Sequence, residues 1–403
     1  HNINFSSSKK NHGYHASFTY NNNEGVIKTN TMNRLAGSLS AYQTGLNGHL
    51  RLDEGINTNF DSWHPVDSRI FERMINLQPT FPVYNSDGTY AQLNGTNTEN
   101  PVELNNHRTE DRKRHRFLGY MKAELQIIDG LSATMNTSYE FNSVKSGLYK
   151  PTYARMEGQS EKGWGQRLYD DYTNKQLELY LTYDKKFADI HHLNLMGGYS
   201  YLDNIYEGFS ATRSGYDSDA FGYNNLGAGS DYRQGDAGSY KGGSKLISFF
   251  GRVNYSLLDR YMLTATLRRD GSSRFGENHK WGVFPSVSFA WRISEEPFMA
   301  STHEWLDNLK LRAGFGVTGN QNGIGEYKSL SILSAAGSAY YDGATNTWKN
   351  SYTQIQNPNP DLKWESTAQW NLGVDFSVFN KLNGTLELYY KKTSDLLWTY
   401  PVP

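Results

Sequence analysis

The stretch from Trp364 to Val378, WESTAQWNLGVDFSV, alternates between two kinds of side chain along its whole length. Its even positions are mostly apolar, as at Trp370 and Leu372, whereas polar side chains such as Asn371 and Asp375 occupy the odd positions. Successive side chains of a β-strand point to opposite faces, so this pattern predicts a strand with one apolar and one polar face. The strand would be about fifteen residues long, well beyond the usual five or six.

The same alternation recurs throughout the chain, for example from Trp281 to Ile293 and from Leu131 to Phe141. It predicts about fourteen strands, near 2–7, 13–20, 32–43, 46–58, 114–128, 131–142, 172–186, 190–205, 244–256, 260–269, 281–293, 309–317, 364–378 and 382–392. Odd-numbered strands are mostly followed by short turns and even-numbered strands by longer links. The longest links lie near 59–113, 143–171, 206–243 and 318–363. Short turns at one rim and long loops at the other are typical of an up-and-down antiparallel transmembrane β-barrel with periplasmic turns and extracellular loops.

The composition supports a membrane barrel by exclusion. The 403 residues carry a formal net charge of -1, which gives no sign of a nucleic-acid partner, and the absence of cysteine excludes disulfides and thiolate metal sites. No run approaches the roughly 20 apolar residues of a membrane-spanning helix, and residues 1–10 do not resemble a signal peptide. A helical membrane protein is therefore excluded, and a β-barrel is not.

Tyrosine and tryptophan gather toward the ends of the predicted strands, as at Trp281, Trp291 and Trp364. Such positions match the aromatic girdles of the two membrane interfaces, although tyrosine favours strands of every kind. The length of the strands favours the girdle interpretation.

One helix is predicted outside the barrel, from Pro65 to Leu77 within the loop 59–113. Its apolar stripe, which includes Ile70, Phe71 and Met74, follows a proline start. A short helix usually buries such a stripe locally, so packing on the loop is favoured over binding of a partner.

No motif predicts catalysis. Gly314, Gly316 and Gly319 form a G-x-G-x-x-G, but a dinucleotide fingerprint must open a helix, and here the segment after Gly319 continues as loop. Common hydrolase and phosphate-loop motifs do not occur in the sequence, so we predict that the protein is not an enzyme.

Metal sites and cofactors are not predicted either. The segment 217–228 begins like a calcium-binding loop, but Phe221 and Ala228 stand where ligands are required. His191 and His192 are adjacent and therefore project to opposite faces of a strand. We expect solvated histidines and no metal site.

The polar face and the long loops carry the candidate binding residues. The inward positions would line a water-filled lumen, and the candidates there are Arg252, Arg268, Arg292, Arg312 and Asp375. Loop aromatics beside amides and carboxylates suit sugar rings or peptides, because flat faces stack while polar groups fix orientation; the candidates are Trp164, Tyr169, Tyr223 and Trp348. Packing within the loops explains any single one of these aromatics equally well.

The segment from Ser248 to Met299, SFFGRVNYSLLDRYMLTATLRRDGSSRFGENHKWGVFPSVSFAWRISEEPFM, strongly resembles the SusC/RagA family of TonB-linked outer-membrane proteins. Residues 14–28, 309–327 and 359–397 also resemble barrel segments of that family, whereas the loops 59–113, 143–171 and 206–243 are individual. The resemblance implies a multi-pass barrel in the outer membrane of a Gram-negative, Bacteroidetes-type cell. It also implies TonB-energised import of a glycan or peptide oligomer together with a SusD-like surface lipoprotein.

The resemblance also defines what this sequence lacks. Nothing in it resembles a signal peptide, a plug or a TonB-contacting segment, and large plugged barrels have about 22 strands. Residues 1–403 are therefore predicted to be a partial outer-membrane barrel domain, because two open sheet edges are not viable in lipid. Contact with the TonB complex would use regions outside this sequence. A passive porin or structural barrel is the alternative function, since neither needs a plug, a lid or energy coupling.

Overall fold

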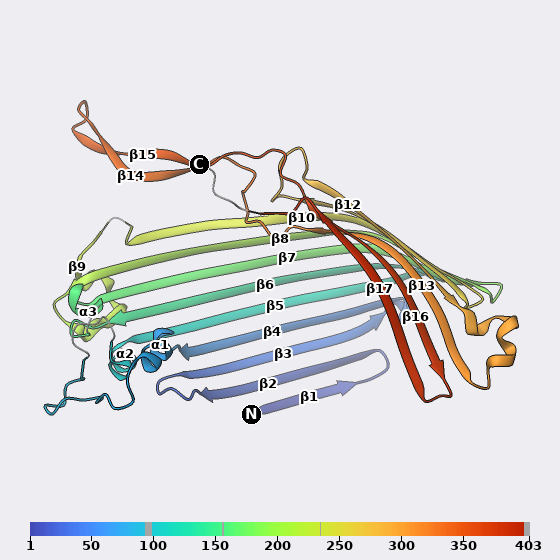
Figure 1. The fold of residues 1–403 in the computed structure, drawn as a ribbon, viewed down its shortest axis with the longest axis horizontal. Coiled ribbons are helices and arrows are strands. Elements are labelled where there is room, and N and C mark those ends of the chain that lie inside the picture. The colour runs from blue at the N-terminus through green and yellow to red at the C-terminus, as the bar shows by residue number, and fades with distance from the viewer. Residues whose placement is uncertain (93–98, 155–156, 234, 399–403) are drawn as a thin grey trace.

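The computed structural model describes residues 1–92, 99–154, 157–233 and 235–398, and its main feature is one large antiparallel sheet (Figure 1). Fourteen strands of the described residues follow one another in the path of this sheet, which confirms the number and order predicted from the sequence. They are β1 (Asn2–Ser8), β2 (His12–Glu24), β3 (Thr31–Gly45), β4 (Leu50–His64), β5 (Thr109–Ile128), β6 (Leu131–Lys150), β7 (Trp164–Phe187), β8 (His191–Tyr216), β10 (Ala237–Leu257), β11 (Tyr261–Ser272), β12 (Trp281–Arg292), β13 (Leu306–Asn320), β16 (Glu365–Val378) and β17 (Leu382–Ser394).

The sheet is strongly curved. Figure 1 shows β1 to β10 as a broad wall, with β13, β16 and β17 turning steeply across one end of it. The described sheet is open, with β1 and β17 as its two edges. Further strands that would complete a barrel stay a prediction.

The remaining elements lie in the connections. The loop rim carries α1 (Arg69–Asn76), α2 (Pro101–His107), α3 (Glu157–Ser160), the single turns η2 (Asp219–Asn224) and η3 (Leu226–Ala228), β9 (Gly229–Asp231), and the hairpin of β14 (Ile332–Asp342) and β15 (Thr347–Gln356). The short-turn rim carries η1 (Leu46–Gly48), η4 (Ile293–Glu295) and η5 (Pro297–Thr302). None of the helices in the described residues is both long and apolar enough to cross a membrane.

Most strands extend further at the loop rim than the sequence pattern predicts. β6 ends at Lys150 and β7 begins at Trp164, so the predicted loop 143–171 shrinks to 151–163, and the predicted loop 206–243 shrinks to 217–236. A tilted membrane strand needs only about 9–11 residues, whereas β8 has 26. The outer ends of these strands therefore extend beyond the membrane, where both faces meet water and the alternation disappears.

Register assigns the two faces of the wall. Leu263 pairs with Phe289, Phe289 with Ala313, and Ala313 with Leu372, so these residues share one face. Leu372 is 49% exposed, as expected of a side chain that faces lipid. The neighbouring positions, such as Asn371, lie on the other, polar face. The alternation read from the sequence is thereby confirmed along this part of the wall.

Two details differ from the prediction. Trp364 is 7% exposed and packs with Phe275 and Phe284 at the loop rim, so its assignment to a lipid-facing girdle is wrong. The helix predicted from 65 to 77 is present as α1, but of its apolar stripe only Ile70 is buried, while Phe71 and Met74 stay exposed. The stripe is thus packed at one residue only.

Candidate functional site: the lumen face and the loop rim

The polar face of the wall is held together by shared ion pairs. On β13 and β16, the Nε and Nη2 atoms of Arg312 donate to the two carboxylate oxygens of Asp375 at 2.9 and 3.0 Å. Lys310 Nζ lies 3.1 Å from the same carboxylate, and Glu387 on β17 lies 3.3 Å from Arg312. Two of the candidate lumen residues, Arg312 and Asp375, are therefore direct partners.

The other lumen candidates lie on the same face but in different surroundings. Arg268 Nε lies 2.7 Å from Asp270, and its Nη2 donates to the buried Ser248 hydroxyl at 2.8 Å. Arg252 is exposed, and its Nε donates a 3.4 Å hydrogen bond to Thr266 Oγ1 on the neighbouring strand. Arg292 ends β12 opposite Lys310, at the short-turn rim. The candidates thus share the polar face but lie at separate places along it, and their lining of a lumen stays a prediction.

A second ionic cluster on the lumen face was missed by the sequence analysis. The side chain of Asp61 on β4 is fully buried and accepts hydrogen bonds from Arg34 Nε at 2.8 Å and Arg114 Nε at 2.7 Å. The Arg114 guanidinium also lies 5.7 Å from the centre of the Trp63 ring. The signal was present in the run DRKRHR at 111–116, whose alternate arginines fall on one face of a strand.

The loop between β4 and β5 is fixed to the wall by a buried group of charges. Asp67 accepts a hydrogen bond from Arg69 Nη2 at 2.8 Å and another from Arg108, whose guanidinium also binds Glu110. Arg69 Nη1 lies 3.5 Å from Glu99. The side chains of the three carboxylates are at most 8% exposed. We call Asp67, Arg69, Glu99, Arg108 and Glu110 the loop clamp.

Burial and charge act in opposite directions within this loop. Burial alone would raise the pKa of Asp67, but hydrogen bonds from Arg69 and the charge of Arg108 outweigh it and hold this pKa well below its usual range. Burial raises the pKa of Glu99, which Arg69 only partly offsets. Burial also lowers the pKa of His107, against the charge of Glu103. Asp67 therefore stays ionised inside the clamp.

Tyr169 and Tyr223, two of the four aromatic candidates, lie beside one arginine. The Arg167 guanidinium is 5.8 Å from the centre of the Tyr169 ring and 5.3 Å from that of Tyr223. The Tyr223 hydroxyl donates to Asp111, and burial together with this bond raises the pKa of Tyr223 to about 12. A Cβ atom on Gly147 would overlap the Tyr223 ring, so η2 packs tightly on β6. Tyr223 thus secures η2 to the outer end of the wall, whereas Tyr169 belongs to the wall itself, on β7.

Trp164 and Trp348 lie elsewhere. Trp164 begins β7 on the opposite face from Tyr169, and Lys150 Nζ lies 4.9 Å from the centre of its ring. Trp348 on β15 is 70% exposed, and its described ring partner is Tyr341 at 5.4 Å. Figure 1 shows the β14–β15 hairpin projecting away from the wall. The four aromatics therefore occupy three separate places on the rim.

The structure also bears on the motifs set aside in the sequence. Gly314, Gly316 and Gly319 lie inside β13, so the glycine pattern opens no helix. The Asp219 carboxylate accepts hydrogen bonds from Tyr149 Oη at 2.7 Å and from Thr152 Oγ1 at 2.8 Å. Asp219 therefore holds η2 against the end of β6. Within the described ranges, no group of histidine and acidic residues has the arrangement of a metal site.

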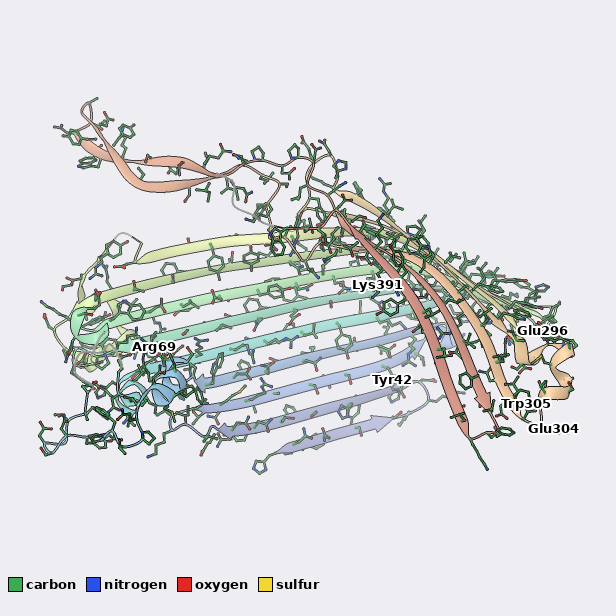
Figure 2. The ribbon with its side chains drawn as sticks, viewed as in Figure 1. Tyr42, Arg69, Glu296, Glu304, Trp305 and Lys391 are labelled. Carbon is green, nitrogen blue, oxygen red and sulfur yellow. The ribbon has the colours of Figure 1, made fainter. Side chains whose placement is uncertain are left out.

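The two rims of the wall differ in the size of the connections that they carry. Figure 2 shows Arg69 of the loop clamp, the first residue of α1, at one end of the broad wall, and Glu296 and Trp305 at the opposite end. At that opposite end the Trp291 Nε1 donates to Glu296 at 2.9 Å, which ties η4 to the wall. The loop rim thus presents the large insertions and candidate aromatics, and the short-turn rim presents compact, tied-down turns.

Comparison with known proteins assigns the family. The family model described as "TonB dependent receptor-like, beta-barrel" matches residues 2–403. The TonB-dependent receptor P3 of Formosa agariphila is 31% identical over 410 residues, covering 99% of this chain and 40% of the relative. SusC of Bacteroides thetaiotaomicron is 28% identical over 455 residues, covering 100% of this chain and 42% of the relative. The chain thus spans about two fifths of the length of these relatives.

Solved structures agree on the fold. The RagAB peptide importer in its closed-closed state matches with a TM-score of 0.84 at 21% identity, over 100% of this chain and 45% of that one. The siderophore receptor PiuA from Acinetobacter baumannii matches with a TM-score of 0.54 at 13% identity, over 96% and 54%. These matches show the fold, and the family model over residues 2–403 confirms the family resemblance read from the sequence. The chain belongs to the TonB dependent receptor-like β-barrel family of the outer membrane, in which SusC is one of its relatives.

Proposed function

We propose that this chain is the wall of a TonB-energised importer that takes an oligomeric nutrient, a glycan or a peptide, across the outer membrane. A SusD-like surface lipoprotein would close the loop rim, and the TonB complex would act through regions outside this sequence. Relatives named TonB-dependent receptor and SusC support the importer, and the fold of a peptide importer supports it independently.

The observation that carries the proposal is the combination of a polar, charged lumen face with a loop rim that presents aromatic side chains. The lumen face offers hydrogen-bonding charges at several depths, from the Asp61 cluster through Arg268 to Arg312 and Asp375. An oligomer with many polar groups can exchange one set of such partners for the next as it moves. A polar lumen alone also suits a porin, and the relatives named TonB-dependent receptor favour the importer.

The rim provides two kinds of capture surface. Trp164 presents a half-buried ring beside Lys150, whereas Trp348 presents an exposed ring on a projecting hairpin. Aromatic faces bind apolar sugar faces and peptide side chains, and neighbouring charges orient the polar groups. Both substrate classes remain within the proposal.

Uptake in living cells tests the proposal. A strain that carries the protein is compared with a deletion strain for growth and for uptake of a panel of labelled oligosaccharides and peptides. For any panel member that requires the protein, uptake should stop when TonB is deleted or the proton gradient is collapsed. Uptake that persists under both treatments would contradict energised import and would support the passive porin.

A further inference from the structure

Glu54 is a carboxylate on the lipid-facing side of the wall. It pairs in register with Ala41 on β3 and with Met121 on β5, and its neighbours Leu52 and Ile56 on the same face of β4 are apolar. No register shift occurs in β3–β4 or β4–β5, so the alternation of faces holds at this position. The adjacent Asp53 points to the lumen, where it pairs with Arg51 at 2.7 Å.

Within the described part of the chain, Glu54 has neither a cation nor a hydrogen-bond donor. It is exposed, and the nearby cations on the lumen face, Arg51 and Lys122, already bind Asp53 and Glu124. An ionisable side chain that faces hydrocarbon is costly and marks a functional site by default, with a partner to be named. The partner must therefore come from the membrane side.

A shallow hollow of about 530 Å³ lies beside this carboxylate. Gly119 forms its floor, Met121 and Tyr139 line it, and Leu39 and Ile56 lie on the side of β3 and β4. The missing side chain at Gly119 opens this space, because a Cβ atom there would meet only the Phe117 ring at 3.4 Å. The lining is mostly apolar, with Glu54 as its only charged residue and with the hydroxyl-bearing Thr137 and Ser138, which fits an acyl chain beside a cationic group.

The depth of Glu54 matches an inner-leaflet headgroup. It lies four positions after Leu50, the first residue of β4 at the short-turn rim. At about 3.3 Å per residue and a strand tilt of about 40°, it stands roughly 10 Å along the membrane normal from that turn. A side chain at this depth reaches toward the interface, where ammonium headgroups lie.

We propose that Glu54 and the hollow over Gly119 form a binding site for a phospholipid with a primary-amine headgroup, such as phosphatidylethanolamine. The ammonium group donates charge-assisted hydrogen bonds to the Glu54 carboxylate, and one acyl chain lies over Gly119. A choline headgroup carries the same charge but has no N–H to donate. The site is thus selective for the amine and not merely for a zwitterionic lipid.

Native mass spectrometry of the protein purified from outer membranes tests this site. The protein is equilibrated in micelles with equal amounts of dioleoyl phosphatidylethanolamine and dioleoyl phosphatidylcholine, and the retained lipids are counted. We expect retention to favour the amine by about tenfold, since one charge-assisted hydrogen bond is worth at least a factor of ten. Glu54→Gln should bring the ratio close to one. Gly119→Leu should lower retention of the amine lipid although the carboxylate is intact.

Glu124→Gln is the matched control, because this carboxylate belongs to the neighbouring strand but faces the lumen, and it should keep the preference. Heat-modified migration on gels shows that each variant is folded. Equal retention of both lipids by the wild-type protein would overturn the proposal, as would a preference that survives Glu54→Gln. Loss of a dimer in Glu54→Gln, without any lipid preference in the wild type, would instead assign the carboxylate to a second copy and equally overturn it.

Discussion

Leu372 and Asp375 lie on the same strand, yet their two faces of the wall are stabilised in different ways. Leu372 is 49% exposed and contributes to the free energy of unfolding through its partition into lipid, largely independently of its neighbours. Asp375 shares its carboxylate between Arg312 and Lys310, so its contribution depends on theirs. The effects of two substitutions on the free energy of unfolding should therefore be additive on the lipid face and non-additive on the lumen face.

The largest expected effect is at the centre of a lumen-face cluster. Asp61→Ala leaves Arg34 and Arg114 side by side without their shared carboxylate, which should lower the free energy of unfolding by about 3–5 kcal/mol. Asp53→Ala on the same strand breaks a solvated pair and should cost under about 1 kcal/mol. Urea unfolding in vesicles measures both. Equal losses would mean that burial of the ion pair does not distinguish the two sites.

The lipid face has the next largest effect. Leu372→Arg places a charge in hydrocarbon and should cost about 2–4 kcal/mol near the midplane. Asn371→Arg, one residue away on the lumen face, should be mild because water and the carboxylates of the lumen receive the charge. The same unfolding measurement compares them. If the two variants lost equal stability, the assignment of faces would be wrong.

Much of this architecture was predictable because it depends on alternation. The even positions of β16 read as apolar over many residues, and no other regular structure explains that period. The outer ends of β6 and β7 were missed because residues such as Lys145 and Tyr169, which pair across the outer face, lie above the membrane and need not be apolar. The β14–β15 hairpin was missed for the same reason, since water surrounds both of its faces.

The candidate site was less predictable. Alternation placed Arg268, Arg312 and Asp375 on the lumen face, but the pairing of Arg312 with Asp375 depends on the neighbouring strand and is not written in either segment. Asp61 fell within the predicted loop 59–113, so its cluster with Arg34 was not found. Whether a loop aromatic packs or stays exposed depends on tertiary contacts, as the difference between Tyr223 and Trp348 shows.

Acid should lower the stability of the loop held by the loop clamp. The pKa of Asp67 is depressed in the folded state, so its contribution is present above the ordinary aspartate pKa of about 3.9 and is lost as the pH falls below that value. The loss is at most about 1.4 kcal/mol per pH unit for one group. Hydrogen exchange of residues 65–92 between pH 6 and pH 3 measures it. Asp67→Asn should start from a less stable loop and show a flatter dependence; an unchanged slope would assign the acid effect to another group.

The smallest effect on stability is expected at the rim aromatics. Trp348→Ala removes an exposed ring and should change the free energy of unfolding by less than about 0.5 kcal/mol. Combined with Trp164→Ala, it should still weaken uptake of the natural nutrient, because each stacking contact is worth about 1–2 kcal/mol. Growth is compared with surface abundance of the protein. Unchanged growth at unchanged abundance would show that these rings only pack the loops, and the lumen arginines would become the next candidates.

The most direct test of the wall as a membrane barrel is the environment of each side chain along β16. The protein has no cysteine of its own, so single cysteines from 368 to 376 can be spin-labelled one at a time in vesicles. Collision rates with oxygen, which concentrates in lipid, and with a water-soluble nickel complex are then measured by electron paramagnetic resonance. We predict that labels at 370, 372 and 374 collide mainly with oxygen and that labels at 369, 371 and 373 collide mainly with nickel. Equal access at neighbouring positions, or the opposite alternation, would contradict the account.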